Sequence, residues 1–135
     1  MEERLVKVGI THGDINGIGY EVILKTLSDT RITELCTPVI YGSSKIAAYH
    51  RKALELPAVN LSIIAQAEDA GVNRVNIINC VDDETKVELC QSTTVAGEAA
   101  YLALEAAVTD LKRGAVDVLV TAPINKHNIQ NEQFH

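Results

Sequence analysis

Residues 5–27 read LVKVGITHGDINGIGYEVILKTL, and this stretch decides how the rest of the chain is arranged. Its first residues are mostly aliphatic, as in a strand buried on both faces, and its last residues repeat apolar side chains at helical spacing. Between them lies a segment that we call the glycine turn, residues 12–19, which contains Gly13, Gly17 and Gly19. Glycine lacks a Cβ atom, so the backbone of such a turn can bend tightly and approach a ligand. The stretch therefore predicts a strand over residues 5–11, a turn, and a helix that ends near residue 28.

The glycine turn allows two interpretations. If a helix begins near its end, the unpaired N–H groups and the positive end of the helix dipole would favour an anion such as phosphate. The glycine spacing, however, is GxxxGxG, whereas the dinucleotide-binding signature is GxGxxG and the P-loop signature ends in Gly-Lys-Ser/Thr. By itself the turn is equally consistent with an anion site and with a simple connection between a strand and a helix.

A second strand end carries polar residues that belong beside the glycine turn. Residues 116–121, VDVLVT, predict another buried strand, and Pro123 stops it because proline lacks an N–H group and disfavours a helical conformation at the preceding residue. Thr121, Asn125 and Lys126 then lie at the carboxyl end of this strand. In open α/β sheets the ligand crevice lies at that edge, so these residues and the glycine turn are candidates for one site.

The rest of the chain alternates between strand and helix patterns. We predict strands over residues 38–42, 61–65 and 75–79 and helices over residues 45–55 and 94–113, with Ser43 or Ser44 as the N-cap of the first of these helices. This alternation predicts an α/β fold, a three-layer α/β/α arrangement around a mostly parallel sheet. A chain of 135 residues is the size of one domain.

The helix predicted over residues 94–113 has two apolar features. Its large side chains recur at helical spacing and mark an apolar face; they are Tyr101, Leu104, Val108 and Leu111. Its six alanines and Gly97 would let another element approach closely. Packing on the sheet and a subunit interface would both use such a surface, and we favour packing on the sheet.

Composition narrows the class of protein. Hydrophobic residues make up 47% of the chain and aromatic residues only 4%, so the core must be aliphatic. The net charge of −6, without a cluster of basic residues, argues against binding to nucleic acid or to an anionic membrane. Because no apolar run is long enough to span a bilayer and the N-terminus lacks a signal-peptide pattern, we expect a cytoplasmic protein.

The residue types that bind metals show no ligand spacing. The three cysteines and four histidines are far apart, without CxxC or HxxxH, so neither a disulfide framework nor a metal site within the chain is indicated. The acidic residues 82–84 are better explained by a solvated loop than by a metal site.

Three motifs resemble those of a known family. ITHGDINGIGYE at residues 10–21, TVAG at 94–97 and DVLVTAPINK at 117–126 resemble the N-terminal part of the 4-hydroxythreonine-4-phosphate dehydrogenases, the PdxA family of vitamin B6 biosynthesis. The family's patterns are close to TxGDPxGIGPE and LVTAPINK, and the match extends over essentially the whole chain. Ile15 and Tyr20 stand where the family usually has proline, which removes a restraint on φ but leaves the glycines and both acidic residues.

This resemblance implies a homodimeric, NAD-dependent enzyme with the fold of the isocitrate and isopropylmalate dehydrogenases. Such enzymes oxidise the secondary alcohol of 4-phosphohydroxy-L-threonine, a small phosphorylated amino acid, to a β-keto acid that loses carbon dioxide. A divalent metal (Zn, Mg, Mn or Co) held by three histidines polarises the alcohol. Together with the strand-end argument, the resemblance makes seven residues candidates for the cofactor or substrate region: Gly13, Asp14, Gly17, Gly19, Thr121, Asn125 and Lys126.

The resemblance also implies that residues 1–135 hold only part of such an enzyme. The family's Gly-His-Thr-Glu substrate element and its three metal histidines have no counterpart in the sequence, so we expect a single α/β unit that is truncated before the metal-binding region, has no catalytic residue of its own and tends to self-associate. Two other functions stay open. One is a non-enzymatic module that binds phosphate or nucleotides through the glycine turn and Lys126, and the other is an assembly fragment that associates through its alanine-rich helix.

Overall fold

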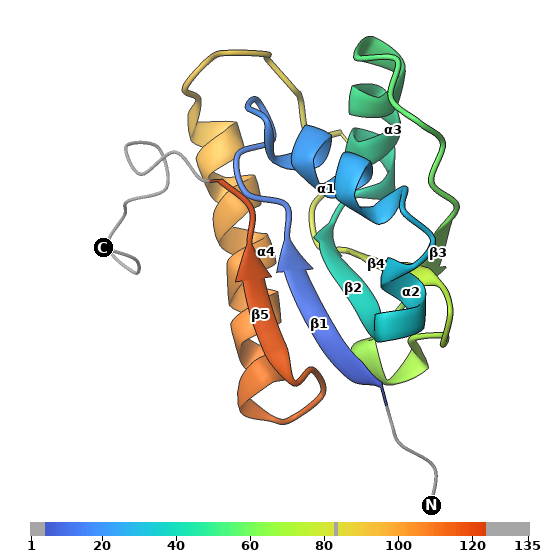
Figure 1. Cartoon of the computed structure of the whole chain (residues 1–135). Helices are drawn as coiled ribbons and strands as arrows, with labels where there is room; N and C mark the ends of the chain where they lie inside the picture. Colours follow the sequence, from blue (N-terminus) through green and yellow to red (C-terminus); the bar gives the residue numbers. More distant parts are fainter. Residues whose placement is uncertain (1–4, 83, 124–135) are drawn as a thin grey trace, which may run out of the picture.

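The computed structural model describes residues 5–82 and 84–123, in which strands and helices alternate as predicted (Figure 1). The strands are β1 (Val6–Thr11), β2 (Cys36–Gly42), β3 (Leu61–Ile64), β4 (Val75–Asn79) and β5 (Val118–Thr121). The helices are α1 (Gly19–Leu27), α2 (Ile32–Leu35), α3 (Ser44–Ala53) and α4 (Thr94–Lys112), with a 3₁₀ turn, η1, at Ala67–Asp69. The sequence does not predict α2 and η1, because elements this short show no periodicity.

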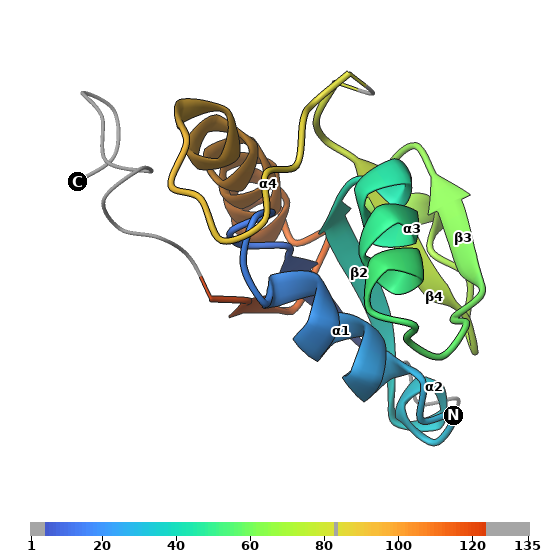
Figure 2. The ribbon, with the colours of Figure 1, turned by 90° about the horizontal axis from the view of Figure 1, so that it is seen from above.

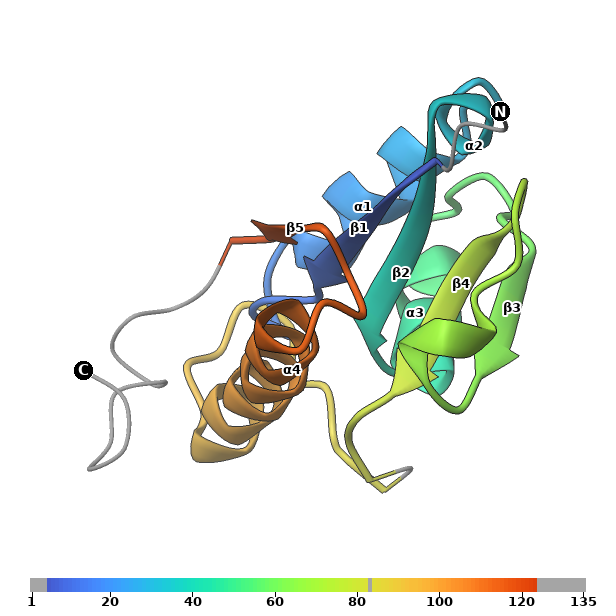
Figure 3. The same ribbon diagram turned by 90° about the horizontal axis from the view of Figure 1, so that it is seen from below.

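The five strands form one parallel sheet in the order β3-β4-β2-β1-β5. Helices α1 and α3 lie together on one face of this sheet and α4 lies on the other (Figure 2, Figure 3). Parallel neighbours must be joined by crossover connections, which the helices provide. The predicted three-layer α/β/α arrangement is confirmed.

Strand β2 lies at the centre of the sheet and shows how the core is divided. Its fully buried Ile40 belongs to an aliphatic cluster with Ile23 of α1, whereas its fully buried Val39 belongs to a second cluster with Ala103 of α4. Burying an aliphatic side chain of this size contributes roughly 1.5–3 kcal/mol. Alternate residues of one strand thus hold both helical layers to the sheet.

Helix α4 packs on the sheet through its small residues. Its buried positions are Ala96, Gly97, Ala99, Ala100, Ala103 and Ala107. The stripe of large apolar side chains that the spacing marks as its apolar face is only half-buried: Tyr101, Leu104, Val108 and Leu111. As a prediction of the packed face, that stripe is wrong, because close approach of a helix to a sheet selects small side chains. The preference for packing on the sheet is confirmed.

Both edge strands expose apolar side chains. Among the described residues, β5 pairs only with β1 and β3 pairs only with β4. Val118 and Val120 of β5 are 45% and 52% exposed, and Ile63 of β3 is 63% exposed. Open edges with exposed apolar side chains favour pairing with further polypeptide. Self-association of the chain stays a prediction.

Candidate functional site

The glycine turn lies at the same edge of the sheet as the end of β5. Strands β1 and β5 are parallel, and their register pairs Thr11 with Thr121, so the chain leaves both strands at their common carboxyl edge. Thr121 is exposed there. Two other candidate site residues, Asn125 and Lys126, lie outside the described part of the chain, so their place at this edge stays a prediction.

Gly13 brings the turn into direct contact with the backbone that follows β5. Its φ of +66° is in the left-handed region, and a Cβ atom on it would lie 2.7 Å from the carbonyl oxygen of Ala122 and closer still to that of Pro123. The N–H of Asp14 donates to the Pro123 carbonyl oxygen at 2.8 Å. Only glycine permits this approach, so the two motifs found in the sequence are in direct backbone contact.

The carboxylate of Asp14 folds back over the turn. Its Oδ1 accepts the N–H of Asn16 at 3.0 Å, and its Oδ2 would lie 3.2 Å from a Cβ atom placed on Gly17. Helix α1 begins two residues later, and its N-cap, Ile18, supplies no side-chain hydrogen bond. A negative charge already stands near the positive end of this helix, which disfavours a second anion there. A half-buried carboxylate suits a hydroxyl or an ammonium group instead.

Asn16 ties the turn to the loop that precedes α4. Its buried side chain donates from Nδ2 to the carbonyl oxygen of Gln91 at 3.0 Å and to the hydroxyl of Thr93 at 3.2 Å. Its Oδ1 accepts the N–H of Glu88 at 2.7 Å. This role of Asn16 could not be predicted from the sequence, because the partners lie more than seventy residues away along the chain and leave no local signal.

His12 is held between α1 and α4. Its Nε2 lies 2.9 Å from the carbonyl oxygen of Ala99, and its Nδ1 lies 2.9 Å from the hydroxyl of Tyr20. The Tyr20 hydroxyl also accepts the N–H of Ser43 at 2.8 Å. Burial lowers the pKa of His12 to about 4 and raises the pKa of Tyr20. At neutral pH both side chains are uncharged and hydrogen-bonded.

His50 of α3 supports the turn from the other side. Its Nε2 lies 2.6 Å from the carbonyl oxygen of Ile15, and its ring stacks on that of Tyr20 with centroids 5.5 Å apart. Ile15 and Tyr20, the two departures from the family pattern, are both fully buried. Burial lowers the pKa of His50, so it too is neutral at pH 7.

The described residues show no arrangement that would hold a metal ion. Among residues 5–82 and 84–123, no group of three or more His, Cys, Asp or Glu side chains converges on one point. The ring nitrogens of His12 and His50 that face the turn and α4 are already used by carbonyl oxygens. The three cysteines are free thiols.

No helix in the described part of the chain is both long enough and apolar enough to cross a bilayer.

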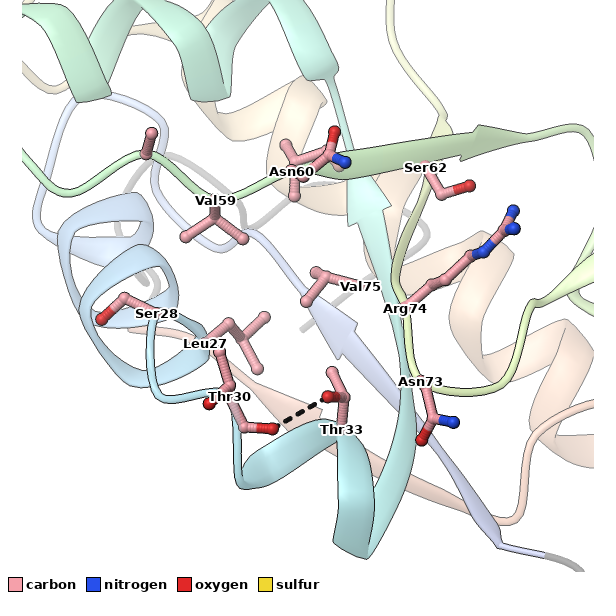
Figure 4. Close-up of a pocket in the computed structure, with 12 residues that line it drawn as sticks. Leu27, Ser28, Thr30, Thr33, Val59, Asn60, Ser62, Asn73, Arg74 and Val75 are labelled. Carbon is pink, nitrogen blue, oxygen red and sulfur yellow. Dashed lines mark hydrogen bonds between the residues drawn. The ribbon is translucent and has the colours of Figure 1, made fainter.

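A cavity of about 570 Å³ lies at the opposite, amino edge of the sheet (Figure 4). Leu27 and Val75 contribute apolar surface to it, and Thr33 and Asn73 are among its polar lining residues. The hydroxyl of Thr33 donates to the carbonyl oxygen of Thr30. This cavity contains none of the candidate site residues, so it is separate from the glycine turn.

Comparison with known proteins gives the family. Residues 34–135 match the family model described as pyridoxal phosphate biosynthetic protein PdxA. The chain is 59% identical over 134 residues to the 4-hydroxythreonine-4-phosphate dehydrogenase of Bacteroides thetaiotaomicron, an alignment that covers 99% of this chain and 36% of that protein. It is 36% identical over 132 residues to the protein of the same name from a Sulfurihydrogenibium species, covering 96% of this chain and 39% of that one.

The fold agrees with this result. A solved structure described as a 4-hydroxythreonine-4-phosphate dehydrogenase from Burkholderia phymatum superimposes with a TM-score of 0.82 at 27% identity, over 94% of this chain and 39% of that chain. The chain therefore spans between 36% and 39% of the length of these three relatives. The resemblance found in the sequence is confirmed, and the chain belongs to the PdxA family, whose named relatives are dehydrogenases.

Proposed function

We propose that this chain is the N-terminal unit of an NAD-dependent dehydrogenase that oxidises the secondary alcohol of 4-phosphohydroxy-L-threonine. One observation carries the proposal: the glycine turn touches the backbone after β5 at the carboxyl edge of the sheet. Open α/β sheets bind their ligands at this edge. The names of two relatives support the choice of substrate.

In this proposal the turn binds and orients the ligand. The carboxylate of Asp14 would accept a hydrogen bond from a hydroxyl group or pair with an ammonium group, and the substrate and the riboses of NAD carry such groups. When bound, NAD would supply the two-electron oxidant that converts the alcohol to a β-keto acid, while the hydroxyl proton leaves to water; the β-keto acid then loses carbon dioxide. Gly13 allows the turn to touch the backbone after β5, and Gly17 leaves room for the Asp14 carboxylate.

The divalent metal does not fit the described residues. No cluster of ligands is present among them, and Nε2 of His12 and Nε2 of His50 each bond a backbone carbonyl oxygen. We therefore assign no step to a metal here. In the proposed enzyme, the part of the relatives that this chain does not match would supply the histidines that hold the metal. That part would also contribute contacts to the homodimer.

The two alternatives differ in how well they suit the structure. A phosphate-binding module is disfavoured by the carboxylate of Asp14, which stands near the start of α1. Assembly through the alanine-rich helix is disfavoured, because most alanines of α4 are buried within this chain. The exposed edge strands offer another route to assembly, and sedimentation at micromolar concentration would test it: a monomer would count against assembly.

A chimera tests the proposed function. We would join this chain to the residues of the Bacteroides thetaiotaomicron relative that it does not match, and follow NADH formation from NAD and 4-phosphohydroxy-L-threonine with a divalent metal. The chimera is expected to turn over within about tenfold of the relative's kcat/KM, because the chain is 59% identical to the part that it replaces. The 135-residue chain alone is expected to show no turnover. A folded but inactive chimera would contradict the proposal, and turnover by the chain alone would contradict the incomplete site.

Asp14→Asn in the chimera tests the role of the carboxylate. Asparagine keeps the oxygen that accepts the Asn16 N–H but removes the charge, so we expect kcat/KM to fall by about tenfold or more while the fold is retained. Asp82→Asn is the matched control, because Asp82 accepts the N–H of Glu84 in the same way on an exposed loop. Equal kcat/KM values for Asp14→Asn and Asp82→Asn would contradict a role of the Asp14 carboxylate in binding the ligand.

A further inference from the structure

The glycine turn is braced by a chain of hydrogen bonds whose direction follows from the groups involved. The carbonyl oxygen of Ala99 can only accept, so Nε2 of His12 must carry the hydrogen. Neutral His12 then offers Nδ1 as an acceptor, and the hydroxyl of Tyr20 donates to it. The same hydroxyl oxygen accepts the N–H of Ser43. Each polar group along this path has a partner.

The path joins four parts of the fold. His12 is the first residue of the glycine turn, directly after β1, and Tyr20 follows the last residue of the turn, in the first turn of α1. Ser43 lies between β2 and α3, and Ala99 lies in α4 on the other face of the sheet. A fully satisfied buried network of this kind fixes one arrangement of its members.

Gly42 provides the space that this network needs. A Cβ atom there would lie 2.8 Å from Nδ1 of His12 and would collide with the hydroxyl oxygen of Tyr20. Apolar packing alone does not account for the hydroxyl, since phenylalanine would fill the same volume without burying a polar group. The hydroxyl is accommodated at the cost of a glycine in β2.

We infer that Tyr20 and His12 are positioning residues, which fix the glycine turn to α4 and to the corner between β2 and α3 and so orient the turn at the carboxyl edge. The inference rests on the proposed function in one respect only, that the turn faces a ligand. The bracing itself is a property of the free chain and is measurable without one.

Protonation of His12 would reverse the central hydrogen bond. Nδ1 would then donate to the Tyr20 oxygen, and the Tyr20 hydrogen would have to turn to the carbonyl oxygen of Ser43, 3.3 Å away. The titratable groups around His12 are Tyr20 of α1 and His50 of α3, while the carboxylate of Asp14 acts on His50. Nothing among these described contacts gives protonated His12 a carboxylate partner, so acid should disturb the turn.

The test compares Tyr20→Phe with Tyr49→Phe in the ¹⁵N-labelled 135-residue chain. Tyr49 also lies against His50, but it is 44% exposed, so it is the matched control for loss of a tyrosine hydroxyl. We expect wild-type His12 to be the Nε2–H tautomer with a hydrogen-bonded Nδ1. We expect Tyr20→Phe to shift the backbone amides of Gly13, Gly17 and Gly19 while Tyr49→Phe leaves them in place. Unshifted turn amides in Tyr20→Phe would overturn the inference.

Two further measurements keep the test decisive. If Tyr20→Phe does not fold, the wild-type chain is titrated with acid. The chemical shifts of the turn amides should then change over the same pH range in which His12 titrates. Turn amides whose shifts do not follow the titration of His12 would overturn the inference. In the chimera, Tyr20→Phe should lower kcat/KM by about tenfold with Tyr49→Phe unchanged, because a small displacement of an orienting group is costly. Equal activity of the two variants would overturn the inference and leave the proposed function standing. An inactive parent chimera would contradict the proposed function. The amide measurements on the 135-residue chain would still test whether Tyr20 and His12 brace the turn.

Discussion

Gly13→Ala is expected to lower the free energy of unfolding by on the order of 3 kcal/mol or more. Two costs add. The φ of +66° lies in the region that alanine adopts only at a cost of roughly 1 kcal/mol. The added Cβ would also meet the carbonyl oxygens of Ala122 and Pro123, so the turn would have to move away and weaken the hydrogen bond from Asp14 to Pro123. Urea unfolding followed by circular dichroism measures the loss.

Gly114→Ala is the control for this prediction. Gly114 follows the C-cap of α4, Arg113, with φ +80°, and a Cβ there would meet nothing within 4 Å. We expect it to cost about 1 kcal/mol, from the backbone conformation alone. If Gly13→Ala costs no more than Gly114→Ala, the close contact between the turn and residues 122–123 is wrong.

Lowering the pH from about 7 to about 4 is expected to destabilise the fold by up to about 3 kcal/mol through His12 alone. Burial lowers the pKa of His12 in the fold to about 4, whereas its ordinary value is 6.5. Between these two values the unfolded chain binds a proton that the folded chain does not. The contribution is therefore fully present above about pH 6.5 and is lost as the pH falls through the folded pKa. Burial lowers the pKa of His50 as well, and its effect has the same sign.

The urea midpoint at a series of pH values measures this loss, with His12→Gln as the comparison. Glutamine can still donate to the Ala99 carbonyl oxygen but does not titrate, so its unfolding free energy should depend less steeply on pH than that of the wild type. The slopes are compared, because the substitution also changes packing and removes the Nδ1 acceptor for Tyr20, and so alters the unfolding free energy by an amount unrelated to titration. An identical slope in the two proteins would show that His12 is not the group that titrates.

The layers and the site edge could be predicted because their signals are local. Aliphatic runs such as that of β2 and the N-cap at Ser43, whose side chain accepts the N–H of Ile46, depend on residues close together in the chain. The contact between the glycine turn and residues 122–123 could be predicted because the carboxyl ends of parallel strands meet at one edge.

The face of α4 could not be predicted from apolar spacing. Leucine and valine dominate such a pattern, but the distance between helix and sheet decides which residues fit, and here Ala103 and Ala107 are fully buried. That distance is a tertiary property. In the sequence, a half-buried large apolar residue such as Leu104 looks the same as a fully buried one.

The hydrogen bonds that brace the glycine turn could not be predicted from the sequence either. His12 and Ala99 are 87 positions apart, and the partners of Asn16 are 75 and 77 positions away, so neither contact has a periodic or local signature. Tyr20 could be recognised only as a departure from a family pattern. Its hydrogen bonds to His12 and Ser43 give that departure a physical reason.

In the proposed function the ligand binds at the carboxyl edge of the sheet and not at the amino edge. The ¹⁵N-labelled chain, titrated with NAD and with 4-phosphohydroxy-L-threonine, distinguishes the two edges. We expect the amides of Gly13, Gly17 and Thr121 to shift most. Shifts confined to Thr33 and Asn73 at the amino-edge cavity, or no shift at either edge, would contradict it.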